Sequence, residues 1–178
     1  MLLVRAAQRD DADDLAAAHI EGWRVGYRGL FPDEYLDAPE FATARLERWR
    51  AWTWGEFAGS ELLVADNGGG VVGFAHIGPE RNAGIEGRGE VYGFYVHPRA
   101  WGTGAATALM DVAQTELAEQ GFEAAVLWVL RDNPRARGFY AKAGWRPTGR
   151  EMMWEGPQTA PAPPEPVAEV EYLVALGG

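Results

Sequence analysis

The spacing of apolar residues changes along the chain. In the first third, apolar residues recur three and four positions apart, which is the period of an amphipathic helix. This pattern predicts helices over residues 11–21 and 40–54, with Asp10 as the N-cap of the first. Between them, the aromatic, glycine-punctuated segment 22–31 predicts a bent helix or a broken turn. Pro32 then suits the first turn of another short helix.

From residue 61 onward, short apolar runs replace the helical spacing, and such runs are typical of strands. Strands are expected over residues 61–66 and 71–77, joined as a hairpin by an Asn-Gly-rich turn. A loop is expected over 78–89, followed by an aromatic-rich strand over 90–96. The almost wholly apolar run 124–130 indicates a buried strand.

Two further helices and three further strands complete the predicted order. The helices are expected over 103–120 and 134–143, and the strands over 2–5, 150–155 and 168–176. Residues 156–166 contain five prolines, so we expect a long loop within the C-terminal hairpin there. The order of elements predicts a single mixed α/β domain over residues 1–178.

Composition excludes several classes of protein. With 47% apolar and 24% charged residues, the chain has ordinary globular composition, which argues against disorder and a coiled coil. It has no cysteine, which excludes disulfides and thiol catalysis and suits a reducing cytoplasm. No apolar run approaches about 20 residues, so no membrane span is expected. No spacing of His, Asp and Glu resembles a metal site, so we expect no metal.

The charge is strongly negative but unevenly distributed. A net charge of −10 argues against general binding to nucleic acid. Residues 97–150, however, hold seven basic and five acidic side chains. This stretch indicates either a local anion site or an ordinary region of a surface made soluble by acid elsewhere.

The most informative segment is 95–106, where a strand ends, a glycine-bearing loop turns and a helix begins. The first N–H groups of a helix have no internal partner and lie at its positive end. Gly102 and Gly104 keep side chains away from them, and Arg99 offers a counter-charge, which predicts a phosphate-binding turn. The segment is not a P-loop, and Thr107 replaces the third glycine of a dinucleotide fingerprint.

Together with two later features, this turn makes the chain resemble the GNAT superfamily of acyl-CoA-dependent N-acetyltransferases. The early segment His19-x-x-x-Trp23-Arg24-x-x-Tyr27-Arg28-Gly29-Leu30 resembles a common bacterial subgroup of that family. The motifs that carry the resemblance are Arg99-x-x-Gly102-x-Gly104-Ala105, similar to the family's pyrophosphate-binding motif, and Asn133 with Phe139-Tyr140 and Gly144-Trp145, similar to its downstream motif. The order of strands and helices matches over nearly the whole chain.

The resemblance implies a splayed sheet and a bound acetyl-CoA. Strands 90–96 and 124–130 would start paired and then diverge, with the pantetheine arm filling the gap. The amide of Phe94 or Tyr95 would polarise the thioester carbonyl. The implied cofactor-binding residues are Phe94, Tyr95, Val96, Arg99, Trp101, Gly102, Thr103, Gly104, Ala105, Ala106, Asn133 and Tyr140. The alternative for the strand positions is an ordinary structural role.

Tyr140 and Glu90 are the candidate catalytic residues. The Tyr140 phenol could protonate the departing CoA thiolate, or it could be a core aromatic. Asn133 could bond the pantetheine or cap a helix. Glu90 could remove the proton of the acceptor amine, and alternation would place it on one face with Tyr92 and Phe94. The alternative for Glu90 is a solvated strand end.

Other polar and aromatic residues could contribute to the site. His19 and His76 are rivals to Glu90 as the base. Trp23, Tyr27 and Phe31 belong to the segment that, by resemblance, covers the acceptor, where they could line an apolar or cation-binding pocket or pack in the core. Four further tryptophans are interpreted as core or interface residues: Trp49, Trp52, Trp54 and Trp128.

The sequence therefore predicts an acetyl-CoA-dependent N-acetyltransferase that acts on a small primary amine by direct attack through a tetrahedral intermediate. Its eight tryptophans leave room for an apolar homodimer interface. Two alternatives remain at this point. One is acetylation of a peptide or protein N-terminus, and the other is a non-catalytic acyl-CoA-binding module.

Overall fold

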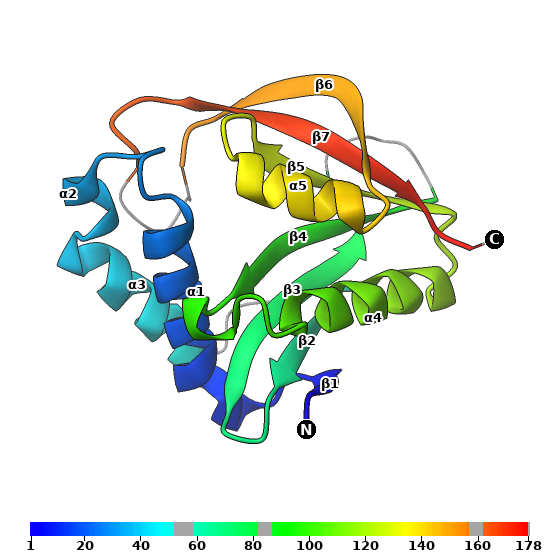
Figure 1. Ribbon diagram of the computed structural model, residues 1–178, viewed down its shortest axis with the longest axis horizontal. Helices are drawn as coiled ribbons and strands as arrows, with labels where there is room; N and C mark the ends of the chain where they lie inside the picture. Colours follow the sequence, from blue (N-terminus) through cyan, green and yellow to red (C-terminus); the bar gives the residue numbers. More distant parts are fainter. Residues whose placement is uncertain (52–58, 82–86, 157–161, 178) are drawn as a thin grey trace.

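The fold is known from a computed structural model, which describes residues 1–51, 59–81, 87–156 and 162–177. Its strands are β1 (Leu3–Ala6), β2 (Glu61–Asp66), β3 (Val71–Pro79), β4 (Arg88–Val96), β5 (Ala124–Leu130), β6 (Arg146–Trp154) and β7 (Val167–Ala175). Its α-helices are α1 (Ala12–Gly26), α2 (Asp33–Leu36), α3 (Pro39–Arg50), α4 (Ala105–Glu119) and α5 (Pro134–Lys142). The strands form one seven-stranded sheet in the order β1-β2-β3-β4-β5-β7-β6, which confirms the predicted mixed α/β class (Figure 1).

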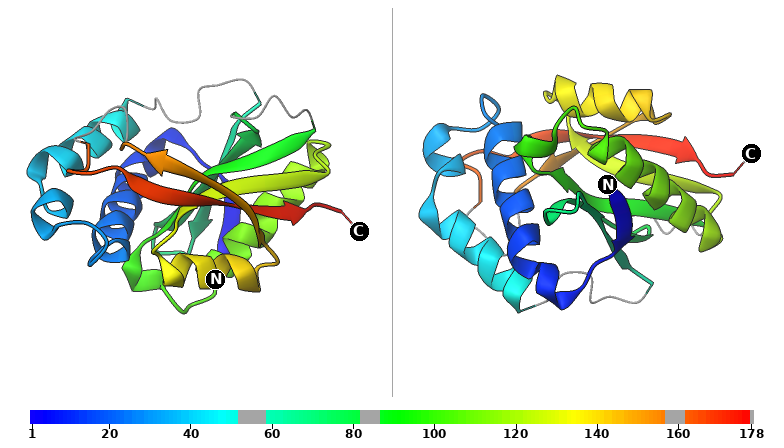
Figure 2. Two further views of the ribbon diagram at one scale, coloured as in Figure 1. Left: turned by 90° about the horizontal axis from the view of Figure 1, so that it is seen from above. Right: turned by 60° about the horizontal axis from the view of Figure 1, so that its bottom comes forward.

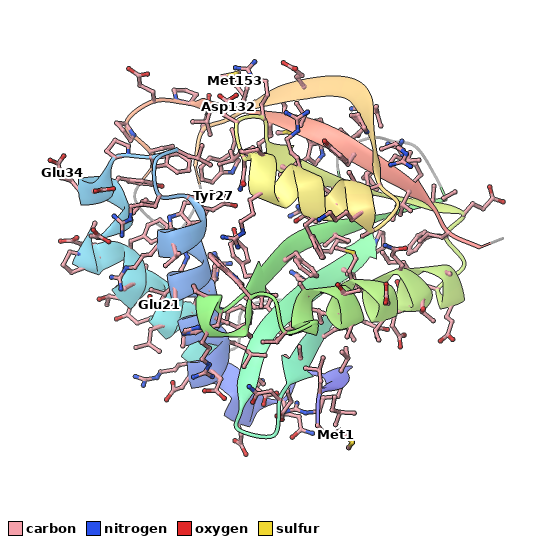
Figure 3. The ribbon with its side chains drawn as sticks, viewed as in Figure 1. Met1, Glu21, Tyr27, Glu34, Asp132 and Met153 are labelled. Atoms are coloured by element: carbon pink, nitrogen blue, oxygen red, sulfur yellow. The ribbon has the colours of Figure 1, made fainter. Side chains whose placement is uncertain are left out.

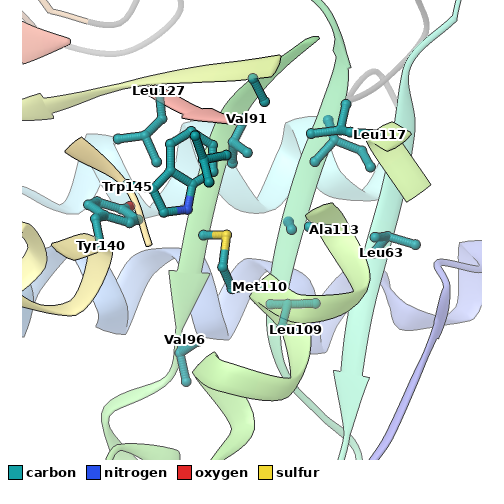
Figure 4. Close-up of a cluster of buried hydrophobic side chains, with 14 of the residues drawn as sticks. Leu63, Val91, Val96, Leu109, Met110, Ala113, Leu117, Leu127, Tyr140 and Trp145 are labelled. Atoms are coloured by element: carbon teal, nitrogen blue, oxygen red, sulfur yellow. The ribbon is translucent and has the colours of Figure 1, made fainter. Parts of the chain in front are cut away.

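Helices cover both faces of this sheet (Figure 2). On one face, Leu109, Met110 and Leu117 of α4 join the largest buried cluster, shown in Figure 4. On the other face, Trp49 of α3 packs with Phe74 of β3 in a separate cluster. Successive residues of a strand point to opposite faces, so one sheet serves both layers.

The sheet opens between its two central strands. All neighbouring strands run antiparallel except β4 and β5, which are parallel. Their pairing runs only from Arg88 opposite Ala124 to Val91 opposite Leu127. Beyond that point the two strands continue without pairing each other. The predicted divergence is therefore confirmed.

A β-bulge interrupts β4 beside this opening. Val91 pairs with Ile77, but Gly93 pairs with His76, so Tyr92 is an extra residue on β4. The bulge reverses the alternation of side chains, and Phe94 joins Val91 on the α4 side of the sheet. The expectation that Glu90, Tyr92 and Phe94 share one face is therefore wrong.

Several predicted boundaries also move. The helix expected to end at residue 21 continues to Gly26. Asp10 is not its N-cap, because residues 9–11 form a short 3-10 helix and Asp11 occupies the cap position.

The strand expected near residue 150 begins at Arg146, with an irregular register between Pro147 and Glu151. Trp52, Trp54 and parts of the loops expected at 78–89 and 156–166 lie outside the described residues.

Candidate active site

Two cavities meet where the sheet opens. The first, called here the loop cavity, has a volume of about 260 Å³ and reaches the loop at Trp101 and Gly102. The second, the aromatic cavity, has a volume of about 150 Å³ and is walled by Trp23, Tyr92 and Trp154. The residues that line both cavities are Tyr27, Phe94, Tyr95, Trp128, Leu130, Tyr140 and Glu169.

The glycine loop ends in the exposed first turn of α4. Gly102 and Gly104 have φ values of 76° and 91°, in the left-handed region that favours glycine. A Cβ at either position would meet no atom within 4 Å, so the space over the loop is open. Gly104 is the N-cap of α4, and the amides that follow it at Ala105 and Ala106 lack intrahelical partners. This geometry suits an anion such as a diphosphate.

The cation nearest the loop cavity differs from the predicted one. Arg99 is exposed, and its guanidinium lies 3.5 Å from the carbonyl oxygen of Val71, outside the cavity lining. Arg135, in the first turn of α5, does line the loop cavity, with its Cζ 3.1 Å from the Trp101 ring centroid. The sequence analysis did not place Arg135 at the site. Its position two residues after Asn133, a predicted cofactor-binding residue, could have indicated it.

Hydrogen bonds hold the walls of the loop cavity in place. The indole N–H of Trp101 donates to the carbonyl of Val96 at 2.8 Å. The Thr103 hydroxyl donates to a carbonyl within the loop, that of Ala100, at 2.7 Å. Asn133 Oδ1 accepts from the amide of Ala136 at 3.1 Å, so Asn133 caps α5 while also lining the cavity.

Tyr140 lies where the two cavities join. Its ring belongs to the main core and is 8% exposed (Figure 4). Burial raises the pKa of its phenol above the ordinary value, so the group stays protonated at neutral pH. No described residue makes a hydrogen bond with this hydroxyl. The Tyr140 ring therefore packs in the core, while its hydroxyl is available as a proton donor.

Glu90 occupies a different environment. It is 2% exposed rather than solvated, and it does not line either cavity. Its carboxylate forms an ion pair with the Arg81 guanidinium at 2.8 Å and accepts the Arg81 backbone N–H at 2.9 Å. The structure thus separates Glu90 from Tyr140.

The two histidines proposed as alternatives are buried in aromatic surroundings, and neither lines the two cavities. His19 accepts a hydrogen bond from the Trp49 indole at 3.3 Å, and burial holds its pKa well below the usual value. Burial, with Arg81 nearby, lowers the pKa of His76 to about 4. Both rings are therefore neutral at pH 7.

The aromatic residues of the acceptor segment divide between cavity and core. Trp23 lines the aromatic cavity. Tyr27, which follows the last residue of α1 (Figure 3), lines both cavities. Phe31 is buried in the neighbouring cluster and lines neither. Trp128, predicted as a core or interface residue, instead lines both cavities, and Trp49 is a fully buried core residue.

Sequence reasoning also missed Glu169. This residue lies on β7 opposite Leu130 of β5, and it lines both cavities. Burial, with Glu90 adding, raises the pKa of its carboxyl to about 7. No local motif marks it, because only the pairing of β7 with β5 brings it to the opening. Among the described residues, no cluster of three His, Cys, Asp or Glu side chains could hold a metal ion.

A sheet that splays between two parallel strands, with a glycine turn before the next helix, is the arrangement expected from the resemblance to the acyl-CoA-dependent N-acetyltransferases. Residues 18–145 match the acetyltransferase (GNAT) family, and the chain belongs to that family. It is an N-acetyltransferase, as the resemblance implied.

Relatives from distant organisms have similar sequences. The chain is 30% identical to the uncharacterized N-acetyltransferase YuaI of Bacillus subtilis over 134 residues, covering 75% of each chain. It is also 30% identical to an N-acetyltransferase of Archaeoglobus fulgidus over 146 residues, covering 80% of this chain and 92% of the relative.

Solved structures share the fold. PaiA N-acetyltransferase from Thermoplasma acidophilum, in complex with coenzyme A, superposes with a TM-score of 0.70 at 16% identity, covering 98% of this chain and 99% of that one. YncA from Salmonella typhimurium, with its cofactor acetyl-CoA, gives a TM-score of 0.66 at 19% identity, covering 100% and 95%. No helix among the described residues is long and apolar enough to cross a membrane.

Proposed function

We propose that this enzyme transfers the acetyl group of acetyl-CoA to the primary amine of a small molecule. The observation that supports this proposal most strongly is the junction of the two cavities at Tyr140. A donor that lies in the loop cavity and an acceptor that lies in the aromatic cavity would meet there. Attack by the amine on the thioester carbonyl requires such a meeting point.

The residues around the loop cavity suit acetyl-CoA. The diphosphate would lie against the amides of Ala105 and Ala106, with Arg135 as counter-charge. The pantetheine arm would follow the open edge of β4, and the amide of Phe94 or Tyr95 would polarise the carbonyl. Bound acetyl-CoA supplies an activated thioester.

The acceptor side supports a small molecule over a peptide. The aromatic cavity has a volume of about 150 Å³ and is walled by Trp23 and Tyr27. A peptide N-terminus would need a more open groove. The available Tyr140 hydroxyl supports catalysis over simple acyl-CoA binding. The exposed Met153 on the edge strand β6 suits a homodimer contact, and the lack of cysteine suits the cytoplasm.

Replacement of Tyr140 by phenylalanine tests the proposal. Tyr140→Phe removes only the hydroxyl, so the leaving thiolate loses its proton donor while the packed ring remains. We expect kcat to fall about a hundredfold. Acetyl-CoA affinity should be retained. The measurements are thiol release with acetyl-CoA and a panel of primary amines, and calorimetry with acetyl-CoA.

Tyr35→Phe is the matched control, because Tyr35 lies on α2 and lines neither cavity. It should leave turnover unchanged. Full turnover in Tyr140→Phe would remove Tyr140 from the mechanism, and failure of the wild-type protein to acetylate any amine would contradict the proposed function.

A further inference from the structure

We infer that the Glu169 carboxylate, on β7, takes the proton from the acceptor amine. This inference rests on the proposed function and deepens it by naming the base. It moves that role from Glu90 on β4 to a strand on the other side of the sheet opening.

The first support is position. Glu169 is paired with Leu130, the last residue of β5, whereas β5 pairs with β4 only as far as Leu127. Glu169 therefore borders the part of the sheet where the two strands have separated. It lines both cavities, as does Tyr140. A base must reach the attacking nitrogen, and the nitrogen must reach the thioester at this junction.

The second support is availability. Among the described residues, Glu169 is the only one whose carboxylate lines either of the two cavities. None of these residues forms a hydrogen bond or ion pair with it. Glu171, which shares its face of β7, is engaged by the Thr148 hydroxyl and the Arg150 guanidinium, each at 2.7 Å. Glu90 is engaged by Arg81, as described above.

The third support is electrostatic. The titratable groups that face Glu169 are Glu90 and Tyr95 of β4, Tyr27 after α1 and Tyr140 of α5. The residues paired with it on β5 and β6 are Leu130 and Met152, which do not titrate. Burial and Glu90 raise the pKa of Glu169 to about 7. A base with this pKa is ionised enough at neutral pH and still accepts a proton readily.

The proton and electron balance is complete without another reactant. Glu169 takes one proton from the ammonium group, and the free nitrogen pair forms a C–N bond with the thioester carbon. Collapse of the resulting tetrahedral species breaks the C–S bond, and Tyr140 gives its proton to the leaving sulfur. The nitrogen then loses its second proton to the Tyr140 phenolate, which restores the phenol. Glu169 releases its own proton to solvent.

The experiment compares pH–rate profiles for acetyl-CoA and the amine that wild-type protein acetylates fastest, from a panel that includes phenethylamine. Wild-type kcat/KM should rise as pH increases through about 7, because Glu169 loses its proton there. In Glu169→Gln, kcat/KM should be about a hundredfold lower than wild type at pH 7, and it should not show this rise. The defect should narrow as pH approaches the amine's own pKa, about 10 for an alkylamine.

Three controls separate the base role from a structural one. Glu169→Asp keeps a carboxylate and should recover part of the rate together with the rise. Glu119→Gln, an equivalent change at an exposed position on α4, should match wild type. In ligand-free protein, a 13C-labelled carboxyl resonance absent from Glu169→Gln should titrate near pH 7.

Each contrary result has a distinct meaning. If Glu169→Gln keeps the wild-type rate and pH profile while Glu90→Gln loses both, the base is on β4 and the inference is overturned while the proposed function stands. If the Glu169 resonance titrates near pH 4, Glu169 does not have the raised pKa that the inference requires, and the inference is also overturned. If wild-type protein acetylates no amine, the proposed function and the inference fall together.

Discussion

Two arginines near the glycine loop differ in what their side chains reach. Arg135 lines the loop cavity and stacks on Trp101, whereas Arg99 lies toward the Val71 carbonyl and does not line the cavity. A guanidinium placed against a diphosphate forms charge-assisted hydrogen bonds. The side chain that reaches the cavity should therefore contribute more to donor binding than the one that the sequence motif indicated.

This difference gives a prediction at the residue scale. Arg135→Ala should weaken acetyl-CoA binding about tenfold, since a hydrogen bond from a charged group contributes roughly 1.5 kcal/mol. Arg99→Ala should have a smaller effect. Calorimetry with acetyl-CoA measures the affinity of each variant. Equal losses of affinity would show that Arg99 contributes as much to donor binding as Arg135.

Among individual residues, those whose role depends on a local motif could be identified from the sequence. The turn at Gly102 and Gly104 and the segment with Tyr140 could be recognised because their spacing along the chain is fixed by one loop or one helix. Glu169 and Trp128 could not be recognised. They reach the cavities only because β7 and β5 pair where β4 has departed.

At the scale of elements, two glycines at helices have opposite consequences. Gly104 caps α4 with φ of 91°, a conformation that an L-residue adopts at a cost of roughly 1–2 kcal/mol. Gly138 lies in the interior of α5 at an exposed position with ordinary helical geometry, and a Cβ there would meet nothing within 4 Å. Glycine in a helix interior is less stable than alanine by about 1 kcal/mol.

The pair forms a matched prediction. Gly104→Ala should lower the free energy of unfolding by about 1–2 kcal/mol and weaken acetyl-CoA binding, because the amides of the turn would shift. Gly138→Ala should raise the free energy of unfolding by roughly 0.5–1 kcal/mol. Urea denaturation of both variants tests this, and the same sign of change in both would contradict it.

The elements themselves were largely predictable, because apolar periodicity reflects which face is buried. The strands 61–66 and 124–130 have the predicted bounds. Alternation failed at Tyr92, where a bulge set by pairing with β3 reverses the faces of β4. That bulge leaves no periodic trace within β4, since it depends on a register between two strands.

For the molecule as a whole, the buried His76 couples stability to pH. Its folded-state pKa is about 4, below the usual 6.5, so the unfolded chain binds the proton first as the pH falls. The contribution of His76 to stability is therefore lost between pH 6.5 and about 4. The loss attributable to this residue should approach about 3 kcal/mol, at roughly 1.4 kcal/mol for each pH unit.

His76→Gln should therefore remove this loss from the stability profile, because the uncharged amide does not titrate. Urea denaturation at pH 7 and pH 5 measures the slope for wild type and variant. His97→Gln serves as the control, since the His97 ring is only half-buried and should change the slope less. An unchanged slope in His76→Gln would show that other groups dominate acid unfolding.

The order of strands and helices, the family and the two local motifs could be inferred from the amino-acid sequence alone. Those features depend on periodicity, glycine positions and residues close together in the chain. Three features depend on the folded chain: the point where β4 and β5 separate, the arginine that lines the loop cavity, and the carboxylate that lines the same cavities as Tyr140. Strand register and sheet order bring these groups together, and contacts across the sheet leave no pattern along a single segment.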